Sequence, residues 1–270
     1  TISVVIWFLA PVVFALLISG GNPLVLLFAP VFGHFVGGQT AIFGMIGLWG
    51  YRKNINNPNG GLFLGLALLK PQLGLIPLAF AIAQWWRKYK DQRKISRQVW
   101  AWIITMIVIY LPGFLFVPDW PSQWLTYPRP LFERAMSGFV PRTLLYFVSS
   151  QTIVYWIILI IVGVLLLLSI WLSNQKEISI DLAVLWGFIV SPLVHDYDLI
   201  QLVPLLDEKK SLLLAVLVSI PGWFVILFEY GNNSAWYIFT IIAPSILCAF
   251  IYYKQKILNQ SGLQQVSETG

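Results

Sequence analysis

The sequence predicts an all-α protein, a polytopic bundle of transmembrane helices in which some helices are short or broken. Hydrophobic residues make up 58% of the chain, and the mean hydropathy is +0.78. Charged residues make up only 10%, whereas a soluble domain carries about 25%. Several apolar runs approach or exceed the roughly 18 residues that indicate a membrane span, and together they predict about eight to ten helical segments.

The ionisable residues and cysteines narrow the possible functions. The net charge of +6 comes largely from short basic loops between apolar runs, which indicates cytoplasmic loops rather than a nucleic-acid-binding surface. Cys248 is the only cysteine, so an internal disulfide and a Cys-based metal site are excluded. The only histidines, His34 and His195, are too few for a multi-histidine zinc or haem site. We therefore expect no cofactor.

The first third of the chain predicts three helical segments. Residues 3–19 are expected to form a span that ends before Pro23, because proline interrupts a helix. A short apolar segment over 24–35 follows. The next segment, 40–51, ends at the basic pair Arg52-Lys53.

A polar break interrupts the next apolar stretch, residues 61–86. This stretch is long for one span, and the residue before a proline avoids the helical region. The helix should therefore stop near Leu69, and two short helices should meet at Lys70-Pro71-Gln72. Both outer ends of the stretch are basic, which predicts a hairpin that enters and leaves on the same side.

Residues 87–97 form the densest basic run, and the positive-inside rule makes it cytoplasmic, with binding of anionic lipid headgroups as the alternative role. A span over 99–117 leads to an outer loop over 118–141, which mixes aromatic residues with arginines such as Arg129. Aromatic rings stack on sugars and guanidinium groups bind phosphate, but an interfacial belt explains the same residues equally well. Residues 144–172 are expected to cross back.

The carboxy-terminal part is expected to contain a second pair of short segments, which meet at a polar sequence from His195 to Asp198. We expect one transmembrane domain over residues 1–258 and a polar, disordered tail over 259–270. The remaining expected segments cover residues 182–194, 199–206, 211–229 and 236–253.

Lys70 is the first candidate for a binding residue. A charge at bilayer depth costs roughly 2.5–3.5 kcal/mol on insertion scales, so the ammonium needs an anionic partner. The phosphate of a lipid carrier would supply one, and so would Asp196 or Asp198 in a purely structural ion pair. Gln72 is expected either to contact the same ligand or to satisfy carbonyl groups that Pro71 leaves without a donor.

His195 lies beside two carboxylates, which favour its cationic form and hence contact with a phosphate or sugar. A general acid or base, or a simple cap of the broken helix, are the alternatives. Asp196 and Asp198 form an Asp-x-Asp sequence, and in an extended segment both carboxylates share a side. Such a pair can hold a divalent cation, but it supplies few of the oxygen ligands required, so we expect no metal site.

The order of these motifs resembles a known family, glycosyltransferase family 87, the polytopic mannosyltransferases of the GT-C class. The resemblance covers roughly residues 1–230 and rests on motifs that occur in the same order. These motifs are Gly38-Gln39 at the start of a helix, the glycines Gly61 and Gly65 before Lys70-Pro71, a basic loop, and Ser191-Pro192 before the His-Asp sequence.

The resemblance implies transfer of a sugar, usually mannose, from a polyprenyl-phosphate carrier to a lipid or glycan acceptor, with inversion and without a metal. Lys70 and His195 would lie at the donor phosphate, Gln39 would line the same cavity, and Arg129 would help to stabilise the departing phosphate. The region around His195 departs from the commoner pattern of the family. The catalytic base of this class is an Asp in the first outer loop, which is expected upstream of Thr1, so the chain is expected to be the carboxy-terminal part of a larger protein.

The sequence thus predicts a hexosyltransferase of the cell membrane, multi-pass, with its site on the extracytoplasmic side. Its partners would be the polyprenyl-phosphate-linked sugar donor, the acceptor and membrane lipids, and not nucleic acid. The alternatives are a transporter or lipid flippase, and an inactive truncated relative. The expected substrate-binding residues are Lys70, Gln39, Gln72, His195, Asp196, Asp198 and Arg129.

Overall fold

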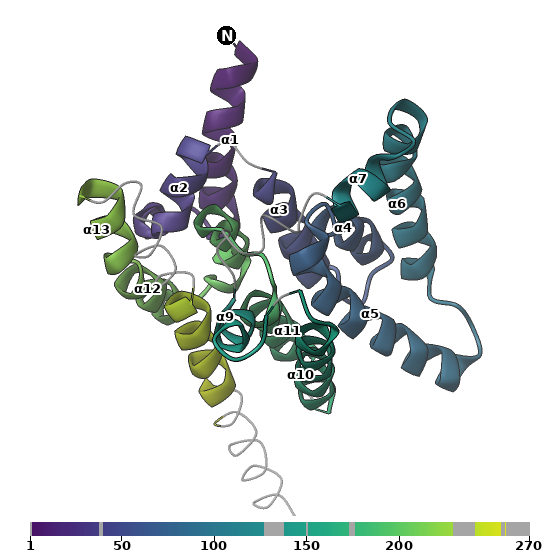
Figure 1. The fold of residues 1–270 in the computed structure, drawn as a ribbon. Coiled ribbons are helices and arrows are strands. Elements are labelled where there is room, and N and C mark those ends of the chain that lie inside the picture. Colours follow the sequence, from purple (N-terminus) through teal and green to yellow (C-terminus); the bar gives the residue numbers. More distant parts are fainter. Residues whose placement is uncertain are drawn as a thin grey trace, which may run out of the picture.

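The computed structural model describes residues 2–37, 40–126, 138–149, 151–172, 176–228, 241–254 and 257. All regular structure in these ranges is helical, which confirms the all-α class (Figure 1). The elements, with η for a 3₁₀ helix, are α1 (Ile2–Ile18), η1 (Pro23–Leu27), α2 (Ala29–Gly37), α3 (Ala41–Lys53), α4 (Asn59–Ala67), α5 (Pro71–Gln92), α6 (Arg97–Phe116), α7 (Trp120–Thr126), α9 (Phe139–Leu145), α10 (Ile153–Trp171), α11 (Lys176–Val190), η2 (Asp196–Leu205), α12 (Lys209–Val218) and α13 (Ile220–Phe228). A further helix covers Ile241–Lys254.

Two of the described helices, α6 and α10, are long and apolar enough to cross a membrane, and the pair α12 and α13 makes a third candidate if it is one bent span. These are fewer clear spans than the sequence predicts, because the apolar runs are divided into shorter helices. The pair α12 and α13 is bent by 42° at Ser219, two residues before Pro221, which cannot continue the hydrogen-bond ladder.

Both predicted breaks are present, but the second begins at Ser191, earlier than the expected segment 182–194 allows. The helix α4 ends at Ala67 and α5 begins at Pro71, and Lys70 between them has φ −117° and ψ 82°. The helix α11 ends at Val190, before the Ser191-Pro192 pair. The prediction of a short second helix is wrong, because α5 continues through the basic residues to Gln92. Lys, Arg and Gln are good helix formers, so the positive charge does not itself end the helix.

Glycines bring α4 close to both of its neighbours, α3 and α6. A Cβ atom on Gly61 would lie 2.0 Å from the carbonyl oxygen of Gln98 in α6, and one on Gly65 would lie 2.5 Å from Thr105. On the other side, a Cβ on Gly47 of α3 would lie 2.4 Å from the backbone nitrogen of Ala67. Small residues at such crossings let helix backbones approach closely, so the glycines that precede Lys70-Pro71 are packing residues.

Replacement of Gly61 by Ala is expected to destabilise the protein by about 1–3 kcal/mol, because the methyl group overlaps the α6 backbone. Gly163→Ala is the matched control. Its Cβ would meet only the end of Ile76 at 3.7 Å, and alanine is the better helix former by about 1 kcal/mol. Thermal unfolding of the two variants checks this, and equal melting temperatures would contradict the close crossing.

The 3₁₀ helix η2 lies at the centre of the packing, against α2 and α3. Its apolar side chains, among them Leu199, Ile200, Leu202 and Val203, are fully buried. The helix α5 packs on α11, which in turn packs on α10. Figure 1 shows α6 and α7 at one edge of the molecule and α12 and α13 at the opposite edge. The core therefore forms around η2, and the two helix breaks meet there.

Candidate functional site

Four residues from the two helix breaks come together, and we call Lys70, His195, Tyr197 and Asp198 the break cluster. Lys70 lies between α4 and α5, and the other three lie at the start of η2. The ammonium group of Lys70 forms an ion pair with Oδ1 of Asp198. The Asp198 side chain is completely buried, and Lys70 is 9% exposed. This ion pair joins the break after α4 to the break after α11.

Asp198 also fixes the backbone at His195. Its second carboxylate oxygen, Oδ2, accepts a hydrogen bond of 3.1 Å from the backbone N–H of His195. The two oxygens of one carboxylate therefore hold two different partners. Because both oxygens have partners and the side chain is buried, Asp198 holds Lys70 and the backbone of His195 in place and is a poor candidate for a base.

The ring of Tyr197 is shared by the two basic side chains. The ammonium nitrogen of Lys70 lies 4.6 Å from the ring centroid, a distance that gives an attractive cation–π contact. The imidazole of His195 stacks on the same ring with a centroid distance of 5.0 Å and an interplanar angle of 13°. Tyr197 thus sets the relative position of the two groups that the sequence nominated for phosphate binding, a role that the sequence analysis missed.

The sequence offered two carboxylates, those of Asp196 and Asp198, as internal ion-pair partners for Lys70, and the structure pairs Lys70 with Asp198. Asp198 is the partner, and the structural alternative of an internal ion pair is therefore present. A buried pair of this kind gains Coulomb energy but loses the hydration of both charges, so its net contribution to stability is small while the loss of one partner is costly. Lys70 carries three N–H donors, and contact of the remaining donors with a ligand stays a prediction.

Neighbouring elements satisfy backbone groups at the two breaks. The hydroxyl of Tyr110 in α6 donates to the carbonyl oxygen of Leu68 at 2.8 Å. The backbone N–H of Gly138, just before α9, donates to the carbonyl oxygen of Ser191 at 2.9 Å. The hydroxyl of Ser191 donates to the carbonyl oxygen of Leu193 at 2.9 Å. These bonds allow non-helical backbone to lie inside an apolar bundle, where an unsatisfied polar group would cost several kcal/mol.

The break cluster does not include the other predicted site residues. Gln72 is partly buried in the first turn of α5. Gln39, Arg129 and the side chain of Asp196 lie outside the described residues. Among the residues that the structure describes, no three His, Cys, Asp or Glu side chains are grouped so that they can hold a metal ion.

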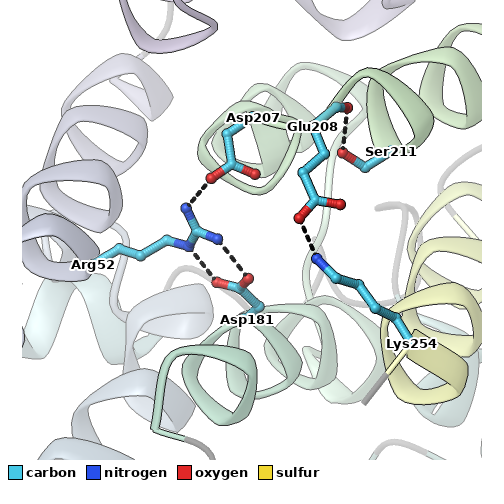
Figure 2. Close-up of polar contacts among 6 residues, drawn as sticks. All are labelled: Arg52, Asp181, Asp207, Glu208, Ser211 and Lys254. Atoms are coloured by element: carbon cyan, nitrogen blue, oxygen red, sulfur yellow. Dashed lines mark hydrogen bonds and ion pairs between the residues drawn. The ribbon is translucent and has the colours of Figure 1, made fainter. Parts of the chain in front are cut away.

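A second group of charges lies at the carboxy-terminal end of α3 (Figure 2). We call Arg52, Asp181 and Asp207 the Arg52 cluster. The guanidinium of Arg52 binds Asp181 through two hydrogen bonds, Nε to Oδ1 at 2.7 Å and Nη2 to Oδ2 at 3.0 Å. Its Nη1 donates to Asp207 at 2.5 Å. Beside it, Lys254 pairs with Glu208. The Arg52 cluster joins the end of α3 to the start of α11 and to the loop after η2.

The spacing of polar residues along η2 is a signal that the sequence analysis missed. His195, Asp198 and Gln201 are three residues apart. Side chains at i and i+3 eclipse one another in a 3₁₀ helix, so these residues form one polar stripe on an otherwise apolar element. An α-helical interpretation of the same segment scatters them around the helix, and the stripe disappears.

The last residue of the stripe, Gln201, lies against α3. A Cβ on Gly44 would lie 2.5 Å from the side-chain amide of Gln201, which is 1% exposed. Eight residues further along α3, Arg52 binds Asp207, which lies six residues after Gln201 and just beyond the end of η2. The helices α3 and η2 therefore run in the same direction, with the break cluster at one end and the Arg52 cluster at the other.

No family model, no curated protein and no solved structure matches the chain.

Proposed function

We propose that the protein is a multi-pass membrane glycosyltransferase that transfers a sugar, mannose in the first instance, from a polyprenyl-phosphate carrier to a lipid or glycan acceptor. The observation that supports this most is the break cluster. Two basic side chains from distant helix breaks, Lys70 and His195, meet on the ring of Tyr197. Polar breaks in apolar sequence are costly and are kept mainly where they serve a function.

The proposed reaction is a direct displacement at the anomeric carbon. The acceptor hydroxyl attacks this carbon, the bond between the carbon and the carrier phosphate breaks, and the configuration inverts. The phosphate leaves with the electron pair, and the ammonium of Lys70 and the imidazole of His195 stabilise its growing charge. A carboxylate that does not belong to the break cluster takes the hydroxyl proton.

Asp198 and Tyr197 orient these groups in the proposal. Asp198 keeps one N–H bond of Lys70, so the ammonium can bind a phosphate oxygen with another without a change of position. Because groups that are oriented before the reaction need no reorganisation during it, electrostatic stabilisation is larger than in water. The basic ends of α3 and α5 place the Arg52 cluster on the cytoplasmic side in this proposal and the break cluster toward the opposite face.

A transfer assay with radiolabelled polyprenyl-phosphate mannose tests the proposal in the purified protein. The wild-type protein is expected to release radiolabelled glycosylated product, and Lys70→Met is expected to reduce the rate by about 100-fold or more. Lys209→Met is the matched control, because Lys209 is an exposed lysine at the start of α12. Full activity of folded Lys70→Met would refute the role of the ammonium.

A transporter or lipid flippase is the second candidate, and the buried Lys70–Asp198 pair between broken helices favours it, because transporters place charged pairs at such breaks. This alternative predicts movement of the labelled carrier across a vesicle membrane with no new glycosidic bond. An inactive relative predicts neither product nor movement. The same labelled substrate therefore distinguishes all three.

A further inference from the structure

We propose that the side-chain amide of Gln201 binds a hydroxyl oxygen of the sugar on the polyprenyl-phosphate carrier, an assignment that rests on the proposed function. Gln201 is the last residue of the polar stripe, three residues after Asp198. Three residues of 3₁₀ helix rise about 6 Å. A phosphate bound by Lys70 beside Asp198 would therefore leave its attached sugar within reach of the next turn of η2, where Gln201 lies.

The amide of Gln201 is a buried donor that lacks an acceptor among the residues that the structure describes. Its Nε2 has no hydrogen-bond partner there, and the residue is only 1% exposed. A buried donor without a partner destabilises the folded state, and such groups are expected mainly at functional sites. The amide therefore points to an oxygen of a ligand as its partner.

The amide lies toward the amino-terminal end of α3. A Cβ on Gly44 would lie 2.5 Å from Cδ and Oε1 of Gln201 and 3.0 Å from its Nε2. Because the Cα–Cβ bonds of a helix tilt toward its N-terminus, the amide is displaced from Gly44 toward the first turn, which begins at Ala41. Thr40, before this turn, is exposed and makes no side-chain capping bond. A helix N-terminus attracts oxygen acceptors, so α3 and Gln201 favour the same kind of atom.

A sugar hydroxyl suits this position better than a second phosphate. In the proposed function Lys70 already serves both Asp198 and the carrier phosphate, and the amide of Gln201 is neutral. A hydroxyl needs no counter-ion, and its oxygen can accept from the amide while its proton goes to another acceptor. A buried donor of this kind favours substrates that carry the matching oxygen over analogues that lack it. Gln201 would therefore contribute to the choice of sugar.

Thermal unfolding of a matched pair of variants tests whether the amide lacks a partner within the protein. Gln201→Met removes the donor at similar volume, so the melting temperature is expected to rise by about 2–5 °C. Gln98→Met is the control at equal burial. The Gln98 side chain is 3% exposed and makes hydrogen bonds to three carbonyl oxygens and to the indole of Trp85, so its loss is expected to lower the melting temperature. An equal fall for Gln201→Met would overturn the proposal, because the amide would then have a structural partner.

Two ligands separate recognition of the sugar from recognition of the phosphate. In lipid nanodiscs, polyprenyl-phosphate mannose is expected to raise the melting temperature of the wild-type protein by more than polyprenyl phosphate does. In Gln201→Met the two rises should be equal, and kcat/KM for transfer should fall about 10-fold. Gly44→Ala should give the same result with Gln201 still present, because its methyl group would displace the amide. Gln98→Met should keep the larger rise with the mannose compound.

The outcomes distinguish a failure of this assignment from a failure of the proposed function. Transfer by the wild-type protein with equal rises for both compounds would keep the function and refute recognition of the sugar by Gln201. A larger rise with the mannose compound that Gln201→Met retains would refute it as well. If the wild-type protein shows no transfer and no rise with either compound, the proposed function fails, and the role of Gln201 fails with it.

Discussion

Lys70→Met is expected to lower the free energy of unfolding by about 3–5 kcal/mol, because it leaves the carboxylate of Asp198 without its counter-ion in a place that water does not reach. Asp198 is 0% exposed, so hydration cannot replace the lost partner. Methionine keeps the apolar stem of lysine, so the packing around the break changes little. Thermal or denaturant unfolding of the reconstituted protein measures the loss.

The double variant Lys70→Met/Asp198→Asn separates stability from chemistry. Asparagine is neutral, and its side-chain oxygen can still accept the 3.1 Å hydrogen bond from the backbone of His195. Most of the lost stability should therefore return, since replacing both members of a buried pair is often close to neutral. Transfer should stay absent, because no ammonium remains for the phosphate. Recovery of transfer together with stability would mean that the pair is only structural.

The helix breaks were predictable because their cause is local. Pro71 and Pro192 each restrict the residue before them and remove a backbone donor. The first break lies where the sequence places it, and α11 ends at Val190, four residues before the end of the expected segment 182–194. The charge of Lys70 was also predictable as a group in need of an anion. The sequence offered Asp196, Asp198 or a ligand as that anion and could not rank them, because the ranking depends on how η2 turns after His195.

The sequence could not predict which residues of distant helices contact each other across the bundle. Arg52 and Asp181 lie 129 residues apart, and nothing in their local sequences links them. Tyr110 falls within the expected span 99–117, and its hydroxyl donates to the carbonyl oxygen of Leu68 at the break. Such contacts depend on which helices become neighbours, and here that choice follows from glycines such as Gly61, whose sequence pattern shows a close crossing but not the partner helix.

The number of spans was overestimated for a geometric reason. The sequence analysis divided the apolar runs at Pro23 and Pro71, but it still expected a bundle of transmembrane helices from segments too short to cross a membrane. The helices α3 and α4 have 13 and 9 residues, which corresponds to about 20 and 14 Å of rise, less than the roughly 30 Å of a bilayer core. The 3₁₀ geometry of η2 was missed for a similar reason, because ten residues in this conformation are uncommon and have no strong propensity signal.

Arg52→Met is expected to lower the free energy of unfolding by about 3 kcal/mol, whereas Lys254→Met, from the neighbouring ion pair in Figure 2, should cost less than about 1 kcal/mol. The reason is that the two ion pairs differ in their exposure to solvent. The side chains of Arg52 and Asp181 are 18% and 8% exposed, and those of Lys254 and Glu208 are 36% and 51% exposed. Unfolding of both variants under the same conditions gives the comparison.

The geometry of the three hydrogen bonds from Arg52 allows a second test, with the variant Arg52→Lys. Arg52→Lys keeps the charge but loses the fork that binds Asp181 through two atoms and Asp207 through a third, so it should recover only part of the stability. Sugar transfer by folded Arg52→Met should remain, because Arg52 lies at the far end of α3 from the break cluster. If Arg52→Met and Lys254→Met cost the same, burial does not decide the strength of these pairs. If Arg52→Met abolishes transfer while the protein stays folded, then η2 couples the two clusters, and the Arg52 cluster belongs to the functional site.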